Sequence, residues 1–99
     1  MSDKIHEMFE AVVDEFLEFD RIPVADRRNQ MPDVCGLLYL QEKLGMPQGK
    51  DAVASAVHDE IYLGWTGGQI KKLTQDDVLY INRCGVRYDS GVDSLCMFV

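Results

Sequence analysis

Residues 73–99 carry the strongest local folding signals in this chain, because a helix start, a helix stop, a turn and an apolar run follow one another there. Thr74 is a good N-cap, since its hydroxyl can accept a hydrogen bond from the backbone N–H three residues later. Gly85 can end the same helix by adopting the left-handed conformation that closes a last turn. Together these signals predict a helix from Gln75 to Cys84.

A strand is predicted after this helix. Asp89, Ser90 and Gly91 favour a turn, and residues 95–99 carry no charge. An uncharged strand at an exposed edge invites unwanted pairing, so we expect residues 95–99 to be buried in a small sheet. Residues 59–63 alternate between polar and apolar side chains, which is typical of a half-buried strand. We predict that these two strands pair with each other.

A long amphipathic helix is predicted over residues 2–20. Apolar side chains recur there at three- and four-residue spacing, from Ile5 to Phe19. Pro23 disfavours helical geometry in Ile22 and so ends the helix close by. Acidic side chains take up the remaining face of this helix.

A second helix is predicted over residues 32–44, where Pro32 suits the first turn and Gly45 the end. Its apolar stripe matches that of the first helix, so the two should pack as an antiparallel hairpin. The small residues 51–57 are expected to form a short helical turn. The predicted fold is a single α+β domain over residues 1–99, with an N-terminal helical hairpin and a two- or three-stranded sheet with a capped helix between strands.

Acidic side chains are concentrated near the start of the chain. Residues 1–20 hold seven acidic residues against one lysine, which gives −6 of the formal net charge of −7. Because this charge repels nucleic acid, direct nucleic-acid binding is not expected. The plainest interpretation of these acids is a solvated surface. The alternatives are that they form a docking face for a basic protein partner, or that this helix joins two copies of the chain in a homodimer. The residues assigned to the docking face are Glu7, Glu10, Asp14 and Glu18.

Other features of the sequence bear on location and cofactors. No apolar run approaches the ~20 residues needed to span a bilayer, so no membrane association is expected. The start of the chain does not resemble a signal or transit peptide, and the cytoplasm is the expected location. Cys35, Cys84 and Cys96 form no CxxC pair and are expected to be reduced thiols in or near the core. No cofactor or metal ion is predicted.

Two stretches offer alternatives to a purely structural role. Trp65 lies in the glycine-rich residues 64–68, where it either covers an edge of the core or, if exposed, anchors a partner. The other is the stretch that begins at His58, whose histidine and carboxylates, together with carboxylates near residue 90, are groups that a small metal-dependent hydrolase would use. The residues of this hydrolase hypothesis are His58, Asp59, Glu60, Asp89 and Asp93.

Two segments of the chain, residues 58–63 and 73–99, resemble small proteins of phage and prophage genomes. The likeness lies in His-Asp-Glu-Ile-Tyr-Leu at 58–63, Cys-Gly-Val-Arg-Tyr-Asp-Ser at 84–90 and Met-Phe-Val at 97–99. The resemblance covers about the C-terminal forty residues and includes no catalytic motif. It implies an accessory protein that acts by binding a host or phage component. Capping and turn residues are explained by folding alone, so the favoured prediction is a non-enzymatic interaction protein. The hydrolase is the alternative.

Overall fold

The computed structural model describes residues 3–47, 49–57, 59–65 and 67–98. Its helices are α1 (Asp3–Glu10), α2 (Pro32–Leu44), α3 (Gly67–Ile70) and α4 (Gln75–Arg83), and 3₁₀ turns lie at Val13–Glu15, Phe19–Arg21 and Val24–Asp26. The strands β1 (Val53–Val57), β2 (Glu60–Leu63), β3 (Val86–Asp89) and β4 (Ser94–Phe98) form an antiparallel sheet in the order β1-β2-β4-β3. The fold class is α+β, as predicted, with four strands where two or three were expected.

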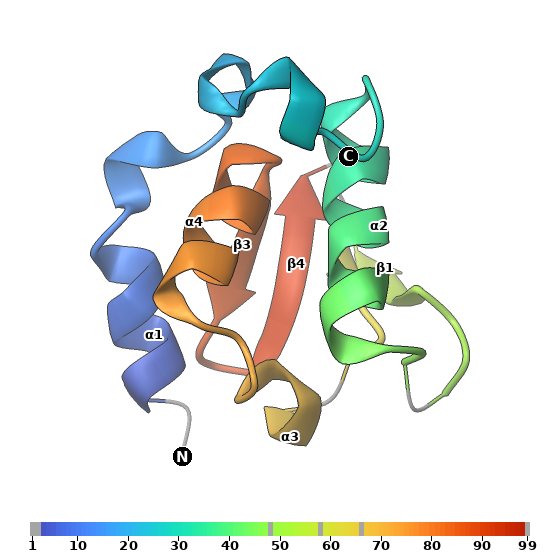
Figure 1. Cartoon of the computed structure of the whole chain (residues 1–99). Coiled ribbons are helices and arrows are strands. Elements are labelled where there is room, and N and C mark those ends of the chain that lie inside the picture. The colour runs from blue at the N-terminus through green and yellow to red at the C-terminus, as the bar shows by residue number, and fades with distance from the viewer. Residues whose placement is uncertain (1–2, 48, 58, 66, 99) are drawn as a thin grey trace.

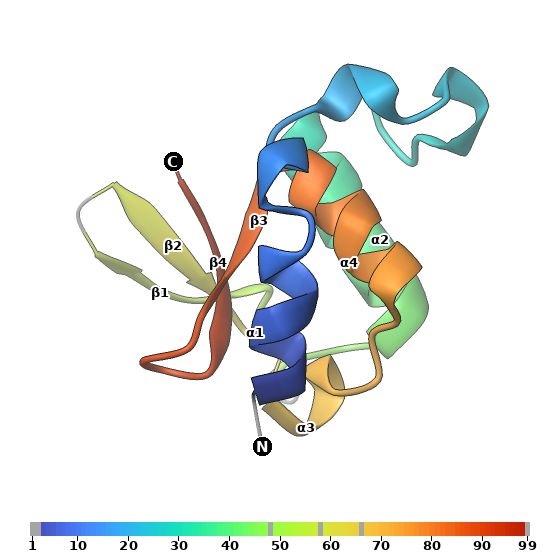
Figure 2. The same ribbon diagram turned by 90° about the vertical axis from the view of Figure 1, so that its left-hand side faces the viewer.

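The helices gather on one face of the sheet (Figures 1 and 2). α4 lies in the middle and contacts α1 on one side and α2 on the other. The core between the helices and the sheet is apolar, and its fully buried side chains include Leu40, Leu63, Ile81 and Leu95. The predicted hairpin of the two N-terminal helices is therefore wrong, because α4 occupies the place between α1 and α2.

The predicted long helix over residues 2–20 is also wrong, because α1 ends at Glu10. Two β-branched residues, Val12 and Val13, follow that end, and such side chains are less favourable in helices. Leu17 then adopts the left-handed conformation with φ 61°, and its N–H donates to the carbonyl of Asn82 in α4 at 3.1 Å. A tertiary hydrogen bond thus redirects a segment whose apolar spacing favours a helix.

The predicted pairing between the strands around residues 61 and 97 is confirmed for β2 and β4. Ile61 lies opposite Met97, and Glu60 lies opposite Phe98. Ile61 and Met97 belong to the core or pack against it, so Glu60 and Phe98 lie on the outer face of the sheet. β4 also pairs with β3 along its other side, which makes it a central strand.

The short helical turn expected at residues 51–57 is wrong, because this stretch contains β1. β1 pairs with β2 so that Val57 lies opposite Glu60 and Ser55 opposite Tyr62. All five β1 residues are exposed, so the strand lacks the apolar–polar alternation that burial on one face would impose. β1 is therefore a strand because of its hydrogen-bonded pairing with β2, and not because one of its faces is buried.

The cysteines are free thiols in the interior, as predicted. Cys35 Sγ lies 3.2 Å from the hydroxyl of Tyr80, and burial raises the pKa of Cys84 well above its usual value. A buried thiol with a raised pKa is unreactive on its own, so Cys84 is a core side chain. Within the described ranges, no helix is long and apolar enough to cross a membrane.

α4 begins at a capping box. Thr74 Oγ1 accepts from the N–H of Asp77 at 3.2 Å, and the Asp77 carboxylate accepts from the N–H of Thr74 at 2.9 Å. The hydroxyl of Tyr39 in α2 also donates to Asp77, at 2.5 Å. One buried carboxylate therefore joins the start of α4 to α2. At the other end of α4, Gly85 has a left-handed φ of 98°.

Replacing Asp77 by asparagine is expected to remove an acid-sensitive part of the stability. Burial raises the pKa of Asp77, but hydrogen bonds from Thr74 and Tyr39 outweigh burial and hold the pKa below its usual value. The unfolded chain then binds the proton more readily, so the carboxylate stabilises the fold above about pH 4 and loses this effect as the pH falls further. Urea unfolding should show a wild-type advantage of about 1 kcal/mol at neutral pH. A wild-type advantage that did not shrink in acid would contradict this account.

Candidate functional site

The end of α1 passes β3, the strand at one edge of the sheet (Figure 2). Side chains of this region line a groove. Its volume is about 410 Å³. Side chains from α1, α4, β3 and β4 contribute to it, so only the folded chain forms it. We call it the aromatic groove, and the residues that line it are Phe9, Glu10, Val13, Phe16, Asn82, Arg87, Tyr88 and Phe98.

Two aromatic pairs shape the aromatic groove. Phe9 stacks on Tyr88 with ring centres 6.1 Å apart, and Phe16 meets Phe98 edge to face at 6.3 Å. The guanidinium of Arg87 lies 4.1 Å from the centre of the Phe98 ring. Phe98 nevertheless stays 56% exposed. Aromatic residues, phenylalanine included, and arginine are enriched at protein–protein interfaces.

Two buried polar atoms of the aromatic groove, Asn82 Oδ1 and Arg87 Nε, have no hydrogen-bond partner among the described residues. Other atoms of both side chains are engaged, since Asn82 Nδ2 donates to the carbonyl of Val86 at 3.1 Å and Arg87 Nη2 binds Glu60. A buried polar atom without a partner costs free energy. Both atoms are closed off from solvent in this fold, so neither is an open contact point for a ligand.

The acids that the sequence assigns to partner binding are exposed, but they do not share one helical face. Because α1 ends at Glu10, only Glu7 and Glu10 lie on that helix. Asp14 lies in the following 3₁₀ turn, and Glu18 lies beyond it. All four side chains face solvent, and Glu10 also lines the aromatic groove. The acids thus follow the segment that forms one wall of the groove.

Glu15 differs from these four acids because it has a structural role. It accepts hydrogen bonds from Arg21 at 2.6 Å and from Arg83 of α4 at 3.1 Å. The hydrogen bond from Arg21 lowers the pKa of Glu15. Arg21 also lies 3.9 Å from Glu18. Glu15 therefore holds the segment against α4 instead of offering its charge to a partner.

Trp65 is not the exposed anchor that one interpretation of the sequence predicts. Only 3% of the residue is exposed, and its indole Nε1 donates to the carbonyl of Gly45 at 2.9 Å. The ring belongs to the main core cluster. It therefore joins the end of α2 to the stretch before α3, which agrees with the alternative that Trp65 covers an edge of the core.

Those residues of the hydrolase hypothesis that the structure describes are not assembled into one site. Glu60 forms an ion pair with Arg87, Asp89 accepts from the Tyr62 hydroxyl at 3.3 Å, and Asp93 accepts from the Tyr88 hydroxyl. Asp59 is exposed, and His58 lies outside the described residues. In the described ranges, no three histidine, cysteine or carboxylate side chains are grouped to hold a metal ion. The hydrolase stays a prediction without a contact that supports it.

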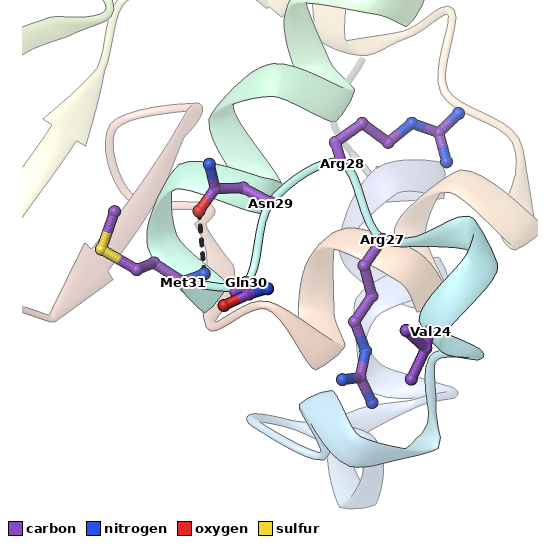
Figure 3. Close-up of a pocket in the computed structure, with 6 residues that line it drawn as sticks. All are labelled: Val24, Arg27, Arg28, Asn29, Gln30 and Met31. Atoms are coloured by element: carbon purple, nitrogen blue, oxygen red, sulfur yellow. Dashed lines mark hydrogen bonds between the residues drawn. The ribbon is translucent and has the colours of Figure 1, made fainter.

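A larger hollow of about 880 Å³ lies in the loop between Val24 and Met31 (Figure 3). Its two arginines point in different directions. Arg28 binds the Glu42 carboxylate at 2.6 Å and lies over the Tyr39 ring, and Arg27 donates to a backbone carbonyl at 2.9 Å. Both guanidinium groups are thus occupied inside the fold. The hollow is a feature of the loop and offers no free cation to an anionic ligand.

The aromatic groove does not follow from the sequence pattern. A continuous helix over residues 2–20 would place Phe16 on the same buried stripe as Phe9. The break after Glu10 instead brings Phe16 to Phe98. The adjacent valines at 12 and 13 are a local signal of that break, but the partner of Phe16 depends on the tertiary fold.

The resemblance of residues 58–63 and 73–99 to small phage and prophage proteins rests on sequence pattern and stays a prediction. The function is therefore inferred from the geometry of the aromatic groove and the acids beside it. Comparison with protein-family models, with curated proteins and with solved structures finds no match to this chain.

Proposed function

We propose that this chain is a non-enzymatic interaction protein that binds a basic segment of a partner protein in the aromatic groove. The observation that carries the proposal is the combination found there: an exposed phenylalanine ring beside an arginine, and a carboxylate at the side. The rings of Phe16 and Phe98 receive an apolar side chain of the partner.

The exposed acids explain why the partner should be basic. Glu7, Glu10, Asp14 and Glu18 are exposed on the segment that passes the aromatic groove, and Glu10 lines the groove itself. Such charges add little affinity each, because water and salt screen them. They accelerate encounter with a surface of opposite sign and repel surfaces of the same sign. Lysine or arginine residues that flank an apolar residue are therefore the expected recognition chemistry.

Replacing Glu7, Glu10, Asp14 and Glu18 together by glutamine is expected to slow binding about tenfold or more at low salt. The probe is a short fluorescent peptide with a central phenylalanine flanked by lysines, and stopped-flow mixing measures its association rate. Raising the salt concentration should slow the native protein towards the rate of the variant. Amide NMR signals of the aromatic groove should shift on titration with the peptide.

A second quadruple variant controls for net charge. It removes the same number of negative charges from exposed acids elsewhere, with asparagine in place of Asp33, Asp51, Asp59 and Asp76. Association with this control should stay close to the native rate. If both variants slowed association equally, the change in rate would come from the overall charge and not from the position of these four acids. An unchanged rate in the glutamine variant would leave these acids as a solvated surface.

A further inference from the structure

Two of the three cysteines meet inside the fold. Cys35 lies in α2 and Cys84 directly follows α4, and both side chains are buried in one small cluster with Ile22. A hydrogen bond joins the two thiols. A Cβ atom placed on Gly36, the neighbour of Cys35, would lie 3.1 Å from Cys84 Cβ. The missing side chain at Gly36 therefore lets α2 approach the end of α4 at this point.

The two thiols differ in acidity. Burial raises the pKa of Cys35, but the hydrogen bond with the Tyr80 hydroxyl and the backbone N–H groups of Asn29 and Arg28 outweigh burial and lower the pKa below its usual value. Burial raises the pKa of Cys84, and so does the neighbouring sulfur of Cys35. Cys84 therefore keeps its proton while Cys35 loses its own. A thiolate beside a neutral thiol is the arrangement of a nucleophilic cysteine and the cysteine that resolves its oxidised form.

The Tyr80 hydroxyl can follow the charge of Cys35. Its oxygen lies 3.2 Å from Cys35 Sγ, and it donates to the carbonyl of Asp26 at 2.6 Å. While Cys35 is neutral, its S–H can donate to the hydroxyl oxygen. When Cys35 ionises, the hydroxyl can turn its one proton from the carbonyl to the sulfur. Tyr80 is therefore a positioning residue that stabilises the thiolate.

The segment that binds the Cys35 sulfur also borders the hollow between Val24 and Met31 (Figure 3). Arg28 and Asn29 supply backbone N–H groups to the sulfur and line this hollow of about 880 Å³. Cys35 is fully buried, so an oxidant reaches it only when this segment opens locally. A small opening admits hydrogen peroxide, which is little larger than water, and excludes bulky reagents.

We propose that Cys35 and Cys84 are a peroxide-sensitive dithiol that closes to a disulfide between α2 and the end of α4. The Cys35 thiolate attacks one oxygen of hydrogen peroxide and the O–O bond breaks. The released hydroxide takes up the proton that Cys35 had lost and becomes water, which leaves Cys35 as a sulfenic acid. The Cys84 sulfur then bonds to Cys35, the S–O bond breaks, and the Cys84 proton leaves with the oxygen as a second water. The two thiols supply the two electrons that the peroxide gains.

Peroxide treatment of the folded native chain tests the proposal. Mass spectrometry of the digested protein should show two peptides joined through Cys35 and Cys84, and dithiothreitol should restore both thiols. Cys96 is the internal control, since it is equally buried and burial raises its pKa, and it should stay reduced. The peroxide dose is one that oxidises the exposed thiol of a Ser90→Cys variant. A native chain that forms no disulfide at this dose, or that oxidises Cys96 equally, overturns the proposal.

Single serine variants test the two roles. In Cys84→Ser, Cys35 should gain oxygen without forming a disulfide, because no thiol is left to resolve the sulfenic acid. In Cys35→Ser, Cys84 should stay reduced. Oxidation of Cys84 in the absence of Cys35 would reverse the roles and overturn the assignment. Cooperative urea unfolding shows that each variant is folded, and the result on the native chain decides the proposal if either variant is not.

The pH profile of Tyr80→Phe tests the positioning role of the hydroxyl. Loss of the hydroxyl should raise the pKa of Cys35, so less thiolate is present at neutral pH and disulfide formation should be several-fold slower than in the native chain. The difference should shrink as the pH rises, because the thiol then ionises without the hydroxyl. A purely structural effect would slow the reaction equally at every pH. Such a constant effect, or an unchanged rate, would overturn this role of Tyr80.

Discussion

Replacing Met97 by alanine is expected to lower the free energy of unfolding by ~2–5 kcal/mol. Met97 is 3% exposed and belongs to the main core cluster. It lies on β4, the strand that pairs with both β2 and β3, opposite Ile61 on one side and Val86 on the other. The shortened side chain would leave a cavity where three strands meet the helices. Urea unfolding followed by the fluorescence of Trp65, the one tryptophan, measures the loss.

Phe98→Ala is the matched control for this prediction. The next residue along β4 points to the other face of the sheet, and Phe98 remains more than half exposed. Its replacement should cost about 1 kcal/mol or less in stability, yet it should weaken binding of the basic peptide in the aromatic groove. Equal destabilisation by both changes would mean that β4 is not oriented as described. Unchanged peptide affinity in Phe98→Ala would argue against the groove.

Replacing Gly85 by valine is expected to cost ~1–3 kcal/mol. Gly85 has φ 98°, a conformation that β-branched residues strongly disfavour. A Cβ atom at this position would also lie 2.8 Å from Leu17 Cδ2. Leu17 is 57% exposed, so its side chain can move away and the steric part of the cost is the smaller one. The backbone conformation should therefore account for most of the loss.

A double-mutant comparison separates the two parts of the Gly85 effect. In the native chain, the stability lost in Gly85→Ala includes both the cost of the backbone conformation and the cost of the close contact with Leu17. In a Leu17→Ala background, the same substitution keeps the cost of the backbone conformation but loses most of that contact. Thermal unfolding should give nearly equal losses in the two backgrounds. A loss that disappears in the Leu17→Ala background would show that the contact, and not φ, decides the cost.

The parts of the fold that can be predicted from the sequence are those that local chemistry specifies. The helix α4 has a capping threonine at one end and a glycine with positive φ at the other, and both act over a few residues. The pairing of β2 with β4 follows from an alternating stretch and an uncharged run that needs burial. Pro32 and Gly45 likewise bound α2, which begins and ends where these residues predict.

The parts that were wrong depend on contacts distant in sequence. After the first helix ends, the path of the chain at Leu17 is held by the hydrogen bond from the Leu17 N–H to the Asn82 carbonyl, and nothing near Leu17 in sequence reveals that partner. β1 is recognisable only through β2, because its exposed small residues carry no pattern of burial. For Trp65 the sequence leaves two alternatives open, and tertiary contacts such as the hydrogen bond to Gly45 decide between them.

The candidate site likewise has one part that the sequence could predict and one part that it could not. The exposure of Glu7, Glu10, Asp14 and Glu18 could be predicted, since clustered charges seldom enter a core. The aromatic groove could not, because Phe16 and Phe98 stand far apart in sequence and meet only after the segment that follows α1 has turned. The exposed acids are the reason for proposing a basic partner, and the aromatic groove is the place proposed for it.

The two edge strands of the four-stranded sheet are protected from unwanted pairing in different ways. A sheet with two bare edges can add copy after copy and grow into a fibre. Here, α1 packs against β3, the strand at one edge, and β1 at the other edge has a shift in register between Val53 and Ser55, which hinders regular pairing with another chain. Loosening α1 from β3 would remove the first of these protections, so mutations that destabilise α1 are the ones to watch for aggregation.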